Sequence, residues 1–233
     1  GGWTVEWQGK MRPDFVILDE NGDGEVRLVE LTRFYQSIYD SKYNAGGAEG
    51  DFKSMDKDSN GTLTLDEFNQ FKVSAPFQPA GTSVLDAIKE AIGNTGSVIY
   101  APRAKNLGSN SLVLAVVGEY PYAEGYGDNP DIGLNSFDTA VLERCYQSDN
   151  KIVVIIFSGR PLIIKDHIDK WDALVAAWLP GMAGEGIADV LFGDYAPTGK
   201  LSFSWPKDIL QLPLNFGESN YDPLFPFGFG LTY

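Results

Sequence analysis

The sequence predicts an α/β fold, with a mostly parallel sheet sandwiched by helices and an inserted all-α segment. Three observations predict it. Short runs rich in β-branched residues alternate with helical stretches beyond residue 80, these runs are apolar almost throughout, and residues 11–74 are instead acidic with helical spacing. Strands that are buried on both faces are typical of a parallel sheet covered by helices.

The elements of the α/β part follow in order after the breaker segment 76–79. Thr82 or Ser83 can cap a first helix, whose apolar stripe is Val84, Leu85, Ile88 and Ile92. The expected strands cover residues 98–100, 112–117, 152–157 and 173–178, and helices are expected around 138–146 and 186–192. Glycine-marked turns separate these elements.

Composition narrows the possible partners. The formal net charge of −14 argues against an extended nucleic-acid or anionic-membrane surface, and no apolar run approaches the roughly 20 residues that a membrane span needs. We therefore expect neither nucleic acid nor membrane as a partner.

Two residue types occur once each in the sequence. Cys145 is the single cysteine, expected as a small buried side chain, and His167, the single histidine, is expected at the surface. We expect a secreted or periplasmic location.

Two twelve-residue loops, DENGDGEVRLVE at 19–30 and DKDSNGTLTLDE at 56–67, carry oxygen donors at the spacing of calcium ligands. Arg27 at position 9 leaves that ligand position to water, and Thr64 can hold a bridging water. At position 7 of each loop the ligand is the backbone carbonyl oxygen, and at positions 1, 3, 5 and 12 it is a side-chain oxygen. The candidate ligands are Asp19, Asn21, Asp23, Glu25 and Glu30 in the first loop and Asp56, Asp58, Asn60, Thr62 and Glu67 in the second.

The flanking residues agree with this assignment. Gly24 and Gly61 occupy position 6, where the loop turns sharply, and Val26 and Leu63 at position 8 can pair across the loops. Aromatic residues stand four positions outside each loop, at Phe15, Phe34, Phe52 and Phe71. Residues 11–74 therefore resemble an EF-hand pair that binds two Ca²⁺ ions, although Pro13 shortens the first entering helix. Met11 and Met55 are too few for a sensor groove, so we interpret the pair as a structural clamp.

The remaining segments carry a second resemblance. They read GGWTVEWQG at the start, VVGEYPYAEGYGDN at 116–129, IIFSGRPLII at 155–164, ALVAAWLPGMAGEGIADVLFGDYAPTGKLSFSWP at 173–206 and DPLFPFGFGLTY at the end. In this order they resemble the second domain of family 3 glycoside hydrolases, above all the exo-acting β-glucan glucohydrolases. The resemblance covers residues 1–10 and 75–233. It implies a six-stranded α/β sandwich packed against a (β/α)-barrel, with the active site in the crevice between them.

The resemblance also implies the chemistry, retaining hydrolysis of a β-glucoside or β-glucan by two carboxyl groups. The family's nucleophile is an aspartate of the barrel in a Ser-Asp-Trp neighbourhood that nothing here resembles, so a barrel domain is the expected partner. The acid/base of the exo-glucanase relatives is the second glutamate of G-E-x-P-Y-x-E, which falls on Glu124. Glu119 competes for this role, but we expect it to order the loop. Trp7 matches an aromatic that stacks on the sugar, or else is buried in the core.

Two departures from the family leave alternatives open. The family's domain begins some fifty residues before GGWT with a parallel strand, so the sheet is expected to lack a strand. The EF-hand pair replaces a short connection, as a natural insertion or as a graft. The first functional hypothesis is a calcium-binding second domain of a retaining exo-β-glucosidase or β-glucanase. The alternative is a non-catalytic calcium-binding module with a hydrolase domain as its scaffold.

Overall fold

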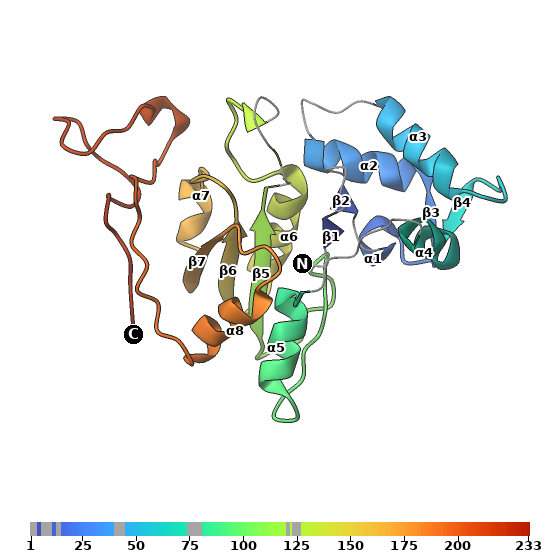
Figure 1. The fold of residues 1–233 in the computed structure, drawn as a ribbon, viewed down its shortest axis with the longest axis horizontal. Coiled ribbons are helices and arrows are strands. Elements are labelled where there is room, and N and C mark those ends of the chain that lie inside the picture. Colours follow the sequence, from blue (N-terminus) through green and yellow to red (C-terminus); the bar gives the residue numbers. More distant parts are fainter. Residues whose placement is uncertain are drawn as a thin grey trace.

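The computed structural model of the protein describes residues 4–5, 11–12, 15–39, 45–73, 81–119, 122 and 127–233. The centre of the α/β part is a three-stranded parallel sheet in the order β5-β6-β7 (Figure 1). Its strands are β5 (Leu112–Gly118), β6 (Lys151–Phe157) and β7 (Ala173–Trp178). These three strands lie where the sequence predicted them, and the sheet is parallel as expected.

Helices cover both faces of this sheet. On one face α6 (Ser136–Tyr146) contributes Leu142 and Cys145 to a core that includes Val154 of β6. On the other face α5 (Val84–Ile92) and α8 (Gly184–Phe192) pack on Ile155 and on each other. The central strand β6 is therefore buried from both sides, which explains its continuous apolar run. A short helix, α7 (Lys165–Ile168), precedes β7.

Side-chain caps fix where the helices begin. The Ser83 hydroxyl accepts the backbone N–H of Asp86 and so caps α5, which decides between Thr82 and Ser83. The Asn135 side chain caps α6 in the same way by accepting the N–H of Asp138. The two caps therefore set the first residues of α5 and α6.

The prediction of a strand at 98–100 is wrong. The run forms no ladder with the described strands; Val98 packs on the α5 side of the sheet, and Ile99 is 71% exposed. β-branched residues favour an extended backbone, but they do not by themselves supply a partner strand. Of the six strands that the family resemblance implied, the described residues form three in the central sheet.

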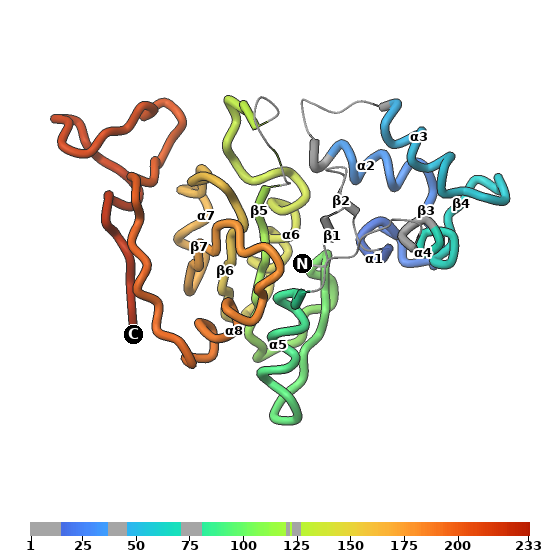
Figure 2. The backbone as a smooth tube through the Cα atoms, in the orientation of Figure 1, coloured from blue at the N-terminus to red at the C-terminus, as the bar shows by residue number. Residues whose placement is uncertain are grey.

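Residues 193–233 contain one short regular element, the 3₁₀ helix η3 (Ile209–Gln211), and otherwise run as an irregular stretch beyond β7 (Figure 2). Trp205 anchors this stretch, since it is 1% exposed, donates its indole N–H to the Leu162 carbonyl at 2.7 Å and pairs with Phe225 in an isolated antiparallel bridge. Of the helices that the structure describes, none is long and apolar enough to cross a membrane.

The segment before α5 forms two helix-loop-helix units. The first is α1 (Phe15–Leu18), β3 (Glu25–Arg27) and α2 (Leu28–Tyr39), and the second is α3 (Ala45–Met55), β4 (Thr62–Thr64) and α4 (Leu65–Val73). Strands β3 and β4 pair antiparallel with Val26 opposite Leu63, as predicted, and both residues are fully buried. The described part of the first entering helix spans four residues, while Pro13, where a break is expected, lies outside the described residues.

Aromatic side chains hold the two units together around that β-bridge. Phe15 packs edge-on against Phe68 with ring centroids 5.7 Å apart, and Phe34 and Phe52 join the same core. The side chain of Phe71 lies outside the described residues. A further short hairpin pairs β1 (Thr4–Val5) with β2 (Met11–Arg12) antiparallel.

The helix pair lies on the β5 side of the sheet and contacts the α/β part through α6 and the segment 103–105 (Figure 1). Phe34 of α2 packs edge-on against Phe137 in the first turn of α6, at 5.8 Å between ring centroids. Arg103 lies over the same Phe137 ring and its Nε donates to the Ile17 carbonyl at 3.1 Å, while Lys105 donates to the Glu20 carbonyl at 3.0 Å. The contact therefore combines one aromatic pair with two cations that bind carbonyls of the first unit.

This contact gives a first prediction. Phe137→Ala should lower the free energy of unfolding by about 1–3 kcal/mol, because it removes a half-buried ring that joins the two parts. Chemical denaturation of the variant measures the change. Phe216→Ala is the matched control, since Phe216 is 71% exposed, and equal stability losses in the two variants would contradict the described contact.

Candidate functional site

The carboxyl ends of β5 and β6 lie side by side and form the base of the first candidate site. Gly118 pairs with Phe157 at the end of the ladder, and the Glu119 N–H continues it by donating to the Phe157 carbonyl at 2.8 Å. A Cβ on Gly118 would lie 1.9 Å from that carbonyl oxygen, so only glycine fits here. This close approach brings Glu119 next to the turn that follows β6.

The Glu119 carboxylate is saturated by hydrogen-bond donors. Its Oε1 accepts from Arg160 Nε at 2.8 Å and lies 2.8 Å from Arg160 Nη2, while Oε2 accepts from Ser158 Oγ at 2.5 Å and from the Tyr122 hydroxyl at 3.0 Å. Its side chain is 14% exposed. Each oxygen therefore has two donor atoms near it, and these bonds tie the end of β5 to Tyr122 and to the turn after β6.

Arg160 extends the same cluster to the far end of the loop. Its Nη1 donates to the Gly127 carbonyl at 2.8 Å, and its guanidinium lies 4.4 Å above the centroid of the Tyr122 ring. Burial and the bond to Glu119 raise the pKa of the Tyr122 hydroxyl, which keeps this group protonated as a donor. The chain from β5 to Gly127 is therefore held by side chains at both of its ends.

Asp138 holds the other side of Gly118. Its Oδ2 accepts the Gly118 N–H at 2.9 Å and the Asn135 side-chain amide at 3.0 Å, and that amide also lies 3.2 Å from the Gly118 carbonyl. The residue as a whole is only partly buried, but desolvation of the carboxylate raises the pKa of Asp138 to about 7. Sequence reasoning missed this role, because an acidic residue in a first helical turn is common without any further function.

Two expected site residues of the α/β part, Glu124 and Trp7, lie outside the described residues.

The single cysteine and the single histidine are both described. Cys145 is buried on α6, as expected. His167 differs from the expected solvated residue, because it is half-buried, stacks on Trp171 at 6.3 Å and contacts the Tyr146 hydroxyl through Nδ1 at 3.2 Å. Burial accordingly lowers the pKa of His167.

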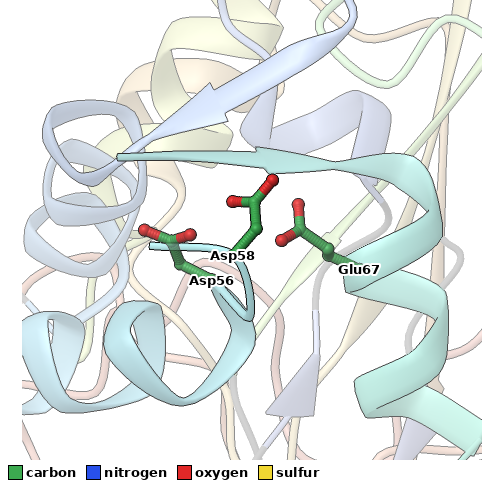
Figure 3. Close-up of side chains that lie close together, drawn as sticks. All are labelled: Asp56, Asp58 and Glu67. Carbon is green, nitrogen blue, oxygen red and sulfur yellow. The ribbon is translucent and has the colours of Figure 1, made fainter. Parts of the chain in front are cut away.

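The second candidate site is the loop between α3 and α4. Asp56, Asp58 and Glu67 each offer a carboxylate oxygen within 4.8 Å of the others, and all three side chains converge on the inside of the loop (Figure 3). Backbone N–H groups orient Glu67, whose Oε1 accepts from Lys57 at 3.1 Å and whose Oε2 accepts from Thr64 at 2.9 Å. The Thr64 bond lowers the pKa of Glu67. The loop thus presents oxygen donors only, as a hard cation requires.

The first loop repeats this arrangement. Glu30 accepts the N–H groups of Glu20 and Arg27, both at 2.9 Å, and Asp19 accepts those of Asp23 at 3.1 Å and Gly24 at 2.9 Å. These pairs correspond position by position to the bonds of Glu67 and Asp56 in the second loop. The shared pattern means that the two loops have the same backbone course.

The two loops differ at position 9. Arg27 turns back onto position 5, where its Nη1 lies 2.6 Å from Asp23 Oδ2, and its Nη2 lies 3.3 Å from Glu25. The Arg27 hydrogen bond lowers the pKa of Asp23. A cation in the first loop would have to compete with Arg27 for Asp23, whereas Thr64 at the same position of the second loop carries no charge.

The parallel sheet with helices on both faces defines an α/β sandwich domain, and its polar cluster lies at the carboxyl edge, where such sheets bind ligands. Residues 45–233 match the family described as the glycosyl hydrolase family 3 C-terminal domain. The chain therefore belongs to this family. The matched range includes the second calcium-type loop and begins after the first.

Individual relatives support the same family assignment. A beta-xylosidase of Formosa agariphila is 31% identical over 66% of this chain and 26% of its own length, and a periplasmic beta-glucosidase of Salmonella typhimurium is 31% identical over 52% and 19%. The crystal structure of an exo-1,3/1,4-beta-glucanase from a Pseudoalteromonas species has 38% identity and a TM-score of 0.61, covering 66% of this chain and 21% of that one. The chain thus spans about a quarter or less of the length of these relatives.

The position of Asp138 gives a second prediction. Because the folded protein holds a proton at Asp138 up to about pH 7 while the unfolded chain releases it near 3.8, the free energy of unfolding should fall as pH rises between these values. The fall should be on the order of 4 kcal/mol, about 1.4 kcal/mol for each pH unit between the two pKa values, and Asp138→Asn should remove it. Denaturation between pH 4 and pH 8 measures this slope. Exposed Asp149 supplies the control variant Asp149→Asn, and an unchanged slope in Asp138→Asn would contradict the pKa.

Proposed function

We propose that this chain is the calcium-binding second domain of a retaining exo-β-glucosidase or β-glucanase, in which Glu124 is the catalytic acid/base. The observation that carries the proposal is the arrangement at the carboxyl edge of the sheet. Tyr122 and Gly127, on either side of Glu124 in the sequence, are both held there by Arg160. Open α/β sheets bind their ligands at this edge.

The choice between the two loop glutamates follows from hydrogen bonding. Glu119 accepts from Arg160, Ser158 and Tyr122, so its oxygens are committed to the fold. An acid catalyst must instead be able to give its proton to a leaving oxygen and later take one from water. This requirement favours Glu124, the second glutamate of GEYPYAE. Trp7 is proposed as the aromatic that stacks on the sugar.

The mechanism requires a partner domain. Glu124 gives its proton to the glycosidic oxygen as the C–O bond breaks, and an aspartate of a (β/α)-barrel domain forms the glycosyl ester. The Glu124 carboxylate then takes a proton from the water that attacks the anomeric carbon, which frees the aspartate and restores both groups. We propose a β-glucoside or β-glucan as the substrate, since relatives are named beta-glucosidase and exo-1,3/1,4-beta-glucanase. A secreted or periplasmic location agrees with the periplasmic relative.

We propose that residues 11–74 form an EF-hand pair for two Ca²⁺ ions. The oxygen-only donor sets, the matching bonds of Glu30 and Glu67 and the Val26–Leu63 bridge support it. In each loop the side chains at positions 1, 3, 5 and 12 and the carbonyl of Glu25 or Thr62 would hold the ion, whose charge would balance the carboxylates. Met11 and Met55 are the two methionines of this segment, too few for the Met-rich groove of a sensor, which favours a structural clamp.

Calcium titration tests this part. We expect dissociation constants between about 10⁻⁶ and 10⁻³ M, with the second loop the tighter because Arg27 competes for Asp23 in the first. In isothermal calorimetry, Glu67→Gln should remove the tighter of the two calcium-binding events, and Glu30→Gln should remove the weaker one. Exposed Glu143 supplies the control variant Glu143→Gln. Equal heats in the wild type and the Glu30→Gln/Glu67→Gln double variant would refute the site.

The role of Glu124 is tested in an enzyme that a family barrel domain completes. Glu124→Ala should lower kcat by about 10²–10⁴-fold on a glucosyl leaving group, because an acid catalyst matters in proportion to how poor that group is. The loss should be far smaller on a 2,4-dinitrophenyl glucoside, whose leaving group needs no proton. Glu143→Ala is the matched control on the outer side of α6. Equal losses on both substrates would contradict the assignment.

A further inference from the structure

We propose that Arg160 is the positioning residue of the proton donor, acting from the turn after β6 on both ends of the segment 123–126. The inference rests on the proposed function of Glu124, which lies in that segment. Arg160 does not itself need to touch substrate. Its contribution is to fix Tyr122, just before the segment, and Gly127, just after it.

One guanidinium makes all of these contacts. Nε and Nη2 face Glu119 Oε1, Nη1 donates to the Gly127 carbonyl, and the flat face of the group covers the Tyr122 ring. Tyr122 is fixed a second time, because its hydroxyl donates to Glu119 Oε2. The planar fork of arginine can point at two acceptors and stack at once, whereas a lysine ammonium has no such face.

The backbone that carries Arg160 is itself fixed. Ser158 is 1% exposed, and its hydroxyl donates to Glu119 at 2.5 Å while it accepts the Arg160 N–H at 3.0 Å. The Ser158 N–H donates to the Trp178 carbonyl at the end of β7. Arg160 is therefore tied to the ends of all three central strands, so its position follows from the sheet rather than from the loop.

Charge compensation makes the arrangement sensitive to loss of either partner. The side chains of Glu119 and Arg160 are 14% and 24% exposed, so each neutralises the other in a largely desolvated place. Removing one leaves the other uncompensated, and the ends of the 123–126 segment then lose their anchors. A misplacement of about 1 Å in a catalytic group can cost about 10²-fold in rate.

The first measurement uses the chain itself. In Arg160→Lys, amide hydrogen exchange of peptides that span residues 119–129 should accelerate at least about tenfold, while peptides of β6 keep their wild-type rates. Exchange that stays unchanged over 119–129 would overturn the proposal. The control for general effects is Lys207→Arg, which makes the reverse exchange of cation in the separate ion pair with Asp222.

The second measurement is a double-mutant cycle in the barrel-completed enzyme. Arg160→Lys should lower kcat about 10²-fold on a glucosyl leaving group and less than about threefold on the 2,4-dinitrophenyl glucoside, with little change in KM. Added to Glu124→Ala, it should cost less than about threefold more on either substrate, because no proton donor is left to misplace.

The outcomes separate the two claims. Equal losses on both substrates for Arg160→Lys, or a full multiplicative loss in the double variant, would overturn the role of Arg160 even if Glu124→Ala shows the leaving-group pattern. If Glu124→Ala itself lacks that pattern, the proposed role of Glu124 is wrong, and the role of Arg160, which rests on it, is wrong as well. A leaving-group pattern in both single variants with no added cost in the double variant supports both claims.

Discussion

The parallel pairing of β5 with β6 is the constraint on which the candidate catalytic edge depends. Because β6 is buried on both faces and β5 runs beside it in register to Gly118 and Phe157, the two strands end at the same level. This common level places Glu119 within hydrogen-bond distance of Ser158 and Arg160 in the turn after β6. The close approach at Gly118 leaves no room for a side chain, so the geometry depends on that one glycine.

The helix pair is a second body with its own core, joined to the sheet through α6. Phe137 touches Phe34, and the next residue, Asp138, accepts the N–H of Gly118. The same helical turn therefore contacts the calcium-type unit on one side and the end of β5 on the other. This arrangement gives the helix pair a physical reason to affect the stability of the site, even though its loops lie far along the sequence from Glu119.

Much of this architecture could be predicted from sequence because it depends on local patterns. The three central strands, helices α5, α6 and α8 and the Val26–Leu63 bridge each have a periodicity or spacing of their own. The run at 98–100 was misassigned because β-branched composition favours an extended backbone but does not say whether a partner strand lies beside it. Arg103, Asp138 and Arg160 were missed as contacts because their partners lie 86, 20 and 41 residues away, and no periodicity reports such pairings.

The central claim is that this chain supplies the acid/base and a barrel supplies the nucleophile, and the configuration of a trapped product tests it most directly. With azide present, the barrel-completed Glu124→Ala variant should form β-glucosyl azide, because azide enters the space left by the carboxylate and attacks the α-linked glycosyl ester. Proton NMR of the anomeric position measures this. An α-glucosyl azide would contradict the account, since it would mean that the missing carboxylate was the nucleophile.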